Sequence, residues 1–115
     1  MPKSLVKLLK KLNRIFRLKA GQVEVYLVDD SFMSQNVLAF PAPKNFPRPD
    51  LPGKIKPLGE IYLNPKQIRR EGGQLTSMLI HGFLHLLGYD HKKKSDRIEM
   101  EKKEKQLWRQ IKSSP

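Results

Sequence analysis

The three histidines of this 115-residue chain fall in one short segment, at His81, His85 and His91. On a helix, His81 and His85 would project from one face one turn apart, the separation that two ligands of one tetrahedral ion require. Gly88 follows, and a glycine there can take the left-handed conformation that ends a helix and turns the chain back. That turn would bring His91 to the same ion. We therefore predict that the three imidazoles bind one metal ion.

The composition narrows the choice of metal. The chain has no cysteine, which excludes disulfides and thiolate ligands and leaves His, Asp and Glu side chains to hold a metal. Three neutral imidazoles favour zinc, although nickel, cobalt and copper also bind such nitrogens. Three protein ligands leave a fourth position open, as in catalytic zinc sites. The alternatives are a closed site with a carboxylate as fourth ligand, or three histidines with separate structural roles.

The spacing matches the long zinc-protease signature H-E-x-x-H-x-x-G-x-x-H except at Gly82, which stands where the general-base glutamate belongs. Without that carboxylate, no group takes the proton from an attacking water, so peptide hydrolysis is disfavoured. Phosphodiester cleavage is less demanding, because a metal ion polarises a non-bridging oxygen. The formal net charge of +12 favours a polyanionic partner, either nucleic acid or an anionic membrane.

The length predicts a single domain over residues 1–115. Periodicity predicts strands at 22–28, 36–40 and 58–64, a short helix from Pro65, and a central apolar helix that carries the histidines and ends at Gly88. Six prolines between positions 41 and 57 predict an exposed loop. The predicted fold class is α+β, with a mixed sheet of about three to four strands and flanking helices.

Two amphipathic helices are predicted at the ends of the chain. The first covers residues 3–19, with Gly21 as its C-cap region, and carries apolar residues on one face and cations on the other. We expect it to pack on the core, with a membrane-surface role as the alternative. The last covers 95–112, with Ile98, Leu107, Trp108 and Ile111 as packing residues. No signal-peptide core or membrane span is predicted, and a cytoplasmic location is expected.

The segment from His81 to His91 resembles the H-G-x-L-H-L-x-G-Y-D-H motif of the YbeY-type endoribonucleases, zinc-dependent bacterial enzymes of ribosomal RNA maturation. Three weaker similarities occur in the expected order: residues 36–41 are similar to T-D-V-L-S-F-P, residues 58–61 to L-G-D-I, and Met100 with Glu104 to M-x-x-x-E. The resemblance implies a zincin-like α+β fold with the zinc helix packed on a small sheet, one zinc ion, and single-stranded ribosomal RNA or the ribosome as partner.

The chain departs from the family pattern in its expected cleft. The family's arginine before the second strand, credited with contacting substrate phosphate, is missing, because residues 29–35 contain no cation. Four substitutions would alter the cleft wall: Gln35, Asn36, Ala39 and Glu60. Lys44 and Arg48 in the proline-rich loop are candidate phosphate contacts, with solvated loop charges as the alternative. Reduced or altered nuclease activity is therefore an open expectation.

Supporting roles are assigned around the motif. Asp90 is a candidate acceptor for a ligand imidazole, fixing its tautomer, or else a turn cap. Tyr89 packs under the site or donates to a substrate oxygen, and Met100 is expected to pack beneath the metal. The leading hypothesis is a zinc-dependent, single-strand-specific endoribonuclease in which a zinc-bound water or ribose hydroxyl attacks phosphorus. The alternatives are a non-catalytic ribosome- or RNA-binding factor that keeps zinc for structure, and a metalloprotease.

Overall fold

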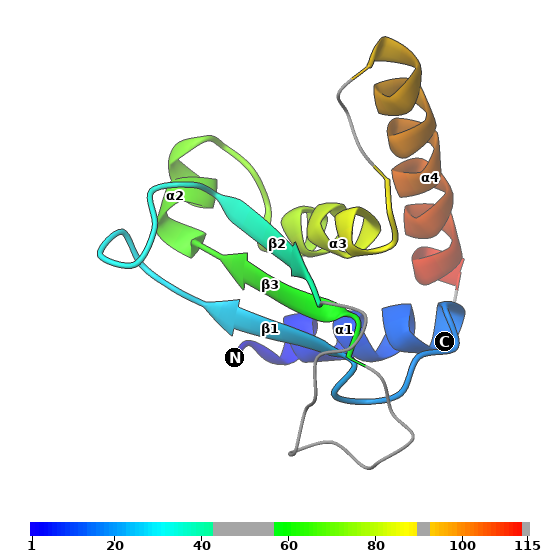
Figure 1. Ribbon diagram of the computed structural model, residues 1–115, viewed down its shortest axis with the longest axis horizontal. Coiled ribbons are helices and arrows are strands. Elements are labelled where there is room, and N and C mark those ends of the chain that lie inside the picture. The colour runs from blue at the N-terminus through cyan, green and yellow to red at the C-terminus, as the bar shows by residue number, and fades with distance from the viewer. Residues whose placement is uncertain (43–56, 90–92, 114–115) are drawn as a thin grey trace.

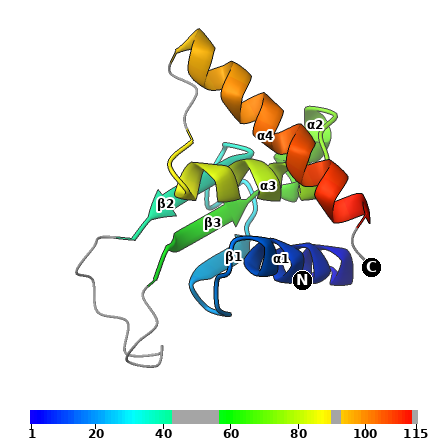
Figure 2. The same ribbon diagram turned by 90° about the vertical axis from the view of Figure 1, so that its right-hand side faces the viewer.

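The computed structural model describes residues 1–42, 57–89 and 93–113. Along the chain, the elements are α1 (Lys3–Ile15), β1 (Val23–Leu27), β2 (Val37–Pro41), β3 (Gly59–Leu63), α2 (Pro65–Arg70), α3 (Leu75–Leu86) and α4 (Lys94–Ser113). Helices α1 and α3 lie on one face of the sheet, and α4 packs on the side of these helices away from the strands (Figures 1 and 2). The α+β class is confirmed.

The described strands form one mixed sheet in the order β1-β3-β2. β1 runs parallel to β3, and β2 runs antiparallel to it. Val25 and Ala39 both pair with Ile61, and Tyr26 pairs with Tyr62. Because side chains alternate along a strand, the residues level with Ile61 face the helices and those level with Tyr62 face the other way. This alternation gives the sheet one covered face and one outer face.

Helix α3 lies at the centre of the core. Leu79, Ile80 and Phe83 have no exposed surface. At Gly82 the helix approaches the sheet closely, since a Cβ there would lie 2.9 Å from Cγ2 of Ile61. A buried helix that rests this closely on the central strand holds its other side chains in a fixed position. The histidines therefore project from a rigid element.

Helix α1 packs on the core, as predicted, through an apolar face that buries Leu5, Leu8 and Leu12. Its predicted end was wrong: the helix stops at Ile15, well before residue 19. Arg17, at φ 56°, takes the left-handed conformation usually left to glycine. The N–H of Leu18 then donates to the carbonyl of Asn13 at 2.7 Å, which satisfies the last turn of the helix.

Helix α4 buries a stripe made of Met100, Leu107 and Ile111. The prediction for Leu107 and Ile111 is confirmed, and Trp108 packs beside them partly buried. The prediction for Ile98 was wrong, because its side chain is 46% exposed. Residues two positions apart lie on different faces of a helix, so Ile98 does not share the buried face of Met100. No helix among the described residues is long and apolar enough to cross a membrane.

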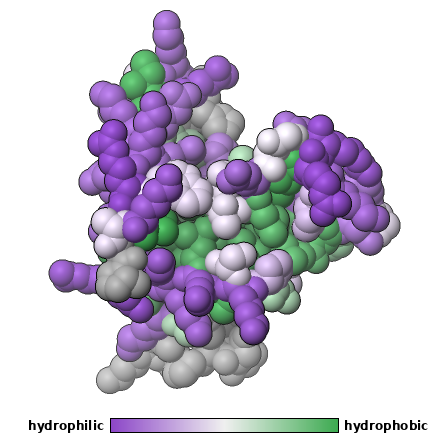
Figure 3. Space-filling model, turned by 180° about the vertical axis from the view of Figure 1, so that it is seen from behind, coloured by the Kyte–Doolittle hydropathy of each residue, from purple (hydrophilic) through white to green (hydrophobic). Residues whose placement is uncertain are grey.

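The space-filling view from behind shows how polarity is distributed over one side of the molecule (Figure 3). Apolar surface gathers in the middle, and hydrophilic side chains cover the flanking surfaces on both sides. This distribution is expected for amphipathic elements that turn their apolar faces toward the core.

Candidate metal centre and its cleft

Helix α3 ends as the sequence predicts, at a glycine turn. Gly88 has φ 99°, and its N–H donates to the carbonyl of His85 at 3.1 Å. The N–H of Tyr89 donates to the carbonyl of Leu84 at 3.0 Å, which completes a Schellman motif. The turn is thus confirmed, whereas Asp90 and His91 lie outside the described residues. Their roles as orienting carboxylate and third ligand stay predictions.

The rings of His81 and His85 converge. Their Nε2 atoms are 3.0 Å apart, and the ring centroids are 4.6 Å apart at an interplanar angle of 77°. Two nitrogens bound to one tetrahedral zinc ion at ~2.05 Å would be separated by about 3.3 Å. The observed separation is within a few tenths of an ångström of that value. The pair therefore fits two ligands of a single ion, and the fit comes from helical spacing on a rigid element.

The described residues contain no set of three His, Asp or Glu side chains placed to hold a metal. The third predicted ligand, which would come from beyond the turn at Gly88, lies outside the described residues. His91 is the histidine that follows that turn in the sequence. The donor set on the described part of the chain consists of two imidazoles, a pattern that suits zinc and other divalent transition ions.

Glu104 on α4 contacts His81 of the histidine pair. Its Oε1 lies 3.2 Å from Nδ1 of His81, and the two side chains are 32% and 25% exposed. When Nδ1 carries the proton, it donates a hydrogen bond to this carboxylate, and the lone pair on Nε2 then points toward His85. A carboxylate in this position selects the tautomer that a metal ligand needs.

From the sequence, this orienting role was predicted for Asp90, and Glu104 was named only for its similarity to a family pattern. The position of Glu104 in its helix could have indicated the role. It lies four residues after Met100 and three before Leu107, on the stripe that is otherwise buried and apolar. A half-buried acidic residue there is stabilised by a polar partner across the helix interface, because removing a charge from water is costly. His81 is that partner.

A cleft of about 540 Å³ opens in front of the two histidines, between β2 and α3. Its lining residues are Asn36, Val37, Leu38, Ala39, Pro41, His81, His85, Gly88 and Tyr89. Asn36 and Ala39 line the cleft, as predicted. Asn36 is fixed at the rim, where its Nδ2 donates to Oε2 of Glu71 at 2.9 Å.

The same prediction was wrong for Glu60 and Gln35. Glu60 accepts a hydrogen bond from the hydroxyl of Tyr62 on the outer face of the sheet, because alternation along β3 turns it away from α3. Gln35 is exposed and does not line the cleft. Met100, with 2% exposure, is a core residue as predicted.

Gly82, the departure from the zinc-protease signature, faces the sheet. A side chain there would meet Ile61 at 2.9 Å and Cγ2 of Val37 at 3.3 Å. A glutamate at this position would therefore have to displace β3 or β2. The close packing of helix on sheet explains the glycine, which leaves this position of the zinc-protease signature without a general-base carboxylate.

Cations are sparse at the described cleft. None of its lining residues is lysine or arginine, and the candidate phosphate contacts Lys44 and Arg48 lie outside the described residues. A second cavity, of about 400 Å³ between α3 and α4, shares His81 and includes Arg97 together with Glu101 and Glu104. Arg97 is thus a cation beside the histidine pair that sequence reasoning did not identify.

Fold and site together define a small α+β protein with a candidate metal centre of the H-x-x-x-H type on a buried helix. The chain belongs to the family described as endoribonuclease YbeY, whose family model matches residues 3–112. The predicted membership of this family is confirmed by this match.

Three relatives, each named endoribonuclease YbeY, show the extent of the similarity. The protein of Nitrobacter winogradskyi is 40% identical over 86 residues, covering 66% of this chain and 44% of that protein. The protein of Rhodopseudomonas palustris is 33% identical over 107 residues, covering 76% and 55%. That of a Wolbachia strain from Drosophila simulans is 34% identical over 99 residues, covering 74% and 65%. The chain thus spans about half the length of the curated relatives it matches, and no solved structure matches it.

Proposed function

We propose that this chain is a zinc-dependent endoribonuclease that cleaves single-stranded RNA in ribosomal RNA maturation, in the cytoplasm. The observation that carries the proposal is the convergence of two imidazole nitrogens to 3.0 Å at the wall of an open cleft. Membership of the endoribonuclease YbeY family supports the reaction class. The net charge of +12 supports a polyanionic substrate.

His81 and His85 would hold the zinc ion, with His91 as the third ligand. When bound, zinc supplies a Lewis acid for phosphoryl oxygens and makes a water acidic near neutral pH. Glu104 holds the proton at Nδ1 of His81, which keeps Nε2 unprotonated and aimed at His85. The rigid packing of α3 keeps both nitrogens in place without reorganisation during the reaction.

The walls of the cleft favour a single strand as substrate. Val37, Ala39 and Pro41 form an apolar wall opposite the histidines, and Tyr89 lines the floor beyond Gly88. An unpaired base can be buried against apolar and aromatic side chains, whereas a base within a duplex is already stacked. Arg97 lines the adjoining cavity that shares His81, and we propose it as a contact for a substrate phosphate.

The experiment compares cleavage of a single-stranded RNA with cleavage of the same sequence in a duplex, with and without a zinc chelator. The wild type should cleave the single strand, and both chelation and His85→Ala should abolish cleavage while circular dichroism shows a folded protein. The control is Lys102→Ala, an exposed change on α4, whereas His85 is on α3. Cleavage that survives both chelation and His85→Ala would contradict the proposal.

A second function, an RNA- or ribosome-binding factor that keeps zinc for structure, is favoured by one specific observation. The described cleft is lined without any lysine or arginine, and residues 29–35 contain no cation. Under this function, salt-sensitive RNA binding would persist with no turnover at any zinc concentration. Measuring binding and cleavage on the same RNA separates the two functions.

A further inference from the structure

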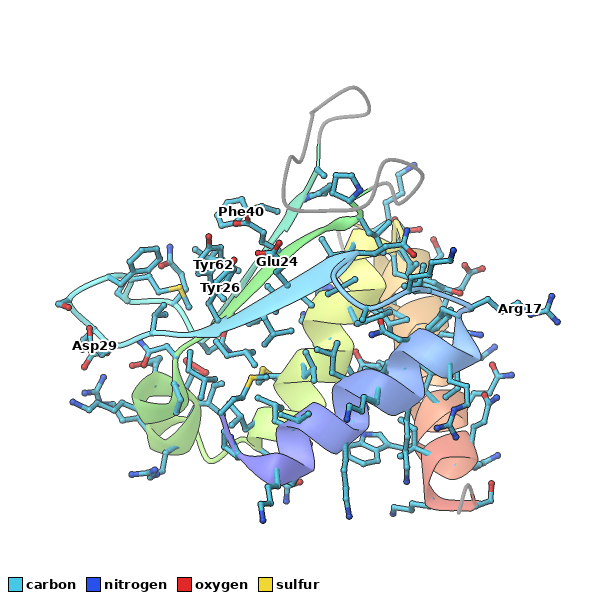
Figure 4. All side chains as sticks on the ribbon, turned by 90° about the horizontal axis from the view of Figure 1, so that it is seen from below. Arg17, Glu24, Tyr26, Asp29, Phe40 and Tyr62 are labelled. Carbon is cyan, nitrogen blue, oxygen red and sulfur yellow. The ribbon has the colours of Figure 1, made fainter. Side chains whose placement is uncertain are left out.

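The outer face of the sheet carries a cluster of aromatic side chains that the described helices leave uncovered. Tyr26 is 41% exposed, Phe40 50% and Phe32 62%. All three contact Tyr62, with centroid distances of 5.2 Å to Tyr26, 5.3 Å to Phe32 and 5.7 Å to Phe40. Figure 4 shows Phe40, Tyr62, Tyr26 and Glu24 rising together from the strands, on the side opposite α1 and α3. We call Tyr26, Phe32, Phe40 and Tyr62 the aromatic face.

The aromatic face is held in place before any partner binds. Tyr26 and Tyr62 are register partners on adjacent strands. Phe32 comes from the segment after β1, where its N–H donates to the carbonyl of Asp29 at 3.0 Å. The next residue, Met33, is buried, and its carbonyl accepts from Nδ2 of Asn64 at 3.0 Å. This anchor fixes Phe32 over Tyr62. A large apolar side chain is usually buried in the core, so its exposure here is notable.

The charged residues of the described strands are acidic, whereas the chain as a whole is basic. Glu24 and Glu60 lie on it and accept hydrogen bonds from the hydroxyls of Tyr26 and Tyr62. The three described strands contain no lysine or arginine, whereas the chain as a whole carries +12. The hydrogen bond to Glu24 raises the pKa of Tyr26 to about 12, and that to Glu60 raises the pKa of Tyr62. The neighbourhood is thus one that favours positive charge.

This combination argues against RNA on the outer face. Two carboxylates would repel phosphates, and the stacked rings cover much of one another's faces, on which bases would have to stack. A cationic polypeptide suits it better: arginine and lysine stems pack on exposed ring edges while their charged ends meet carboxylates. An exposed apolar cluster with such carboxylates is typical of a protein-binding surface.

We propose that the aromatic face, with Glu24 and Glu60, docks an arginine- and lysine-rich segment of a protein partner. The docking surface lies across the sheet from the cleft, so a bound segment leaves the histidine pair accessible. The inference depends on the exposure and charge of this face and not on the proposed nuclease activity.

The test titrates the full chain with a synthetic arginine-rich decapeptide, with the same peptide carrying glutamate in place of arginine, and with single-stranded oligouridine. Binding is measured by isothermal titration calorimetry. The wild type should bind the arginine-rich peptide, and any binding of the acidic peptide to the basic surfaces should be the same in the wild type and in the face variants. The double variant Glu24→Gln/Glu60→Gln should weaken peptide binding about tenfold, because each exposed charge pair contributes a few-fold and the two effects multiply. Phe32→Ser should weaken it several-fold.

The matched control is Glu99→Gln, an exposed carboxylate on α4, which should leave peptide binding unchanged. Equal binding of the peptide by the wild type and by both face variants would overturn the proposal. So would a loss of oligouridine binding in Phe32→Ser without loss of peptide binding, which would assign the face to RNA. A concentration-dependent dimer that Phe32→Ser dissociates, seen by sedimentation, would assign it to a second copy and overturn the proposal as well.

Discussion

Replacing Glu104 with glutamine should weaken zinc binding while leaving the fold intact. Glutamine keeps the size of the side chain and can still accept a hydrogen bond, but it removes the negative charge 3.2 Å from Nδ1 of His81. Loss of an orienting partner of this kind costs roughly 10- to 100-fold in metal affinity. The pair is 25% and 32% exposed, so solvent screens it. We therefore expect the lower end, about tenfold, or about 1.4 kcal/mol.

The assay is a competition for zinc between the protein and a chromophoric chelator at fixed pH, which needs no catalytic activity. The matched control is Glu101→Gln. Glu101 lines the same cavity, and among the described residues no hydrogen bond joins it to His81 or His85. Urea denaturation of the metal-free proteins checks that both variants keep wild-type stability within about 1 kcal/mol. An affinity of Glu104→Gln equal to that of the wild type and of Glu101→Gln would refute the orienting role.

Three further changes test the close approach at Gly82, the left-handed residue Arg17, and an ion pair in which Nη2 of Arg70 lies 2.6 Å from Oδ2 of Asp30. Gly82→Ala should lower the free energy of unfolding by about 1–2 kcal/mol in urea denaturation, because its Cβ would meet Ile61 at 2.9 Å despite the better helix propensity of alanine; an unchanged value would contradict the close approach. Arg17→Gly should raise stability by about 0.5–1 kcal/mol and with it Tm, since φ 56° is strained for arginine; a lower Tm would count against the cap. Arg70 lowers the pKa of Asp30 to about 2, so the stability that Asp30 contributes should be present above pH ~4 and lost as the pH falls toward 2. The stability difference between the wild type and Asp30→Asn should vanish over that range, and a constant difference would show that the ion pair is not its source.

The parts of the site that sequence could predict are those fixed by local geometry. The spacing of His81 and His85 places both rings on one face of any helix, and Gly88 marks where that helix must end. Strand alternation could also have placed Glu60 on the outer face, since Ile61 beside it is the apolar residue of β3 that belongs in the core. The prediction for Glu60 was wrong because similarity to a family motif does not show which face of the strand a residue occupies.

The parts that sequence could not predict depend on packing between distant elements. Glu104 meets His81 because α4 crosses α3 at one particular register, and no local pattern encodes that crossing. The end of α1 at Ile15 could not be predicted either. It is followed by Arg17 in a left-handed conformation, and arginine is a common helix residue that gives no sign of such a turn. The aromatic face appears when β1 and β3 pair in register and bring Tyr26 beside Tyr62.

X-ray absorption at the zinc edge of the purified protein tests the metal centre most directly. One zinc ion per chain, with three imidazole nitrogens at about 2.0–2.1 Å in the wild type and a lost or altered shell in His85→Ala, is the predicted result. A protein that takes up no zinc, or whose zinc shell is unchanged in His85→Ala, would contradict it.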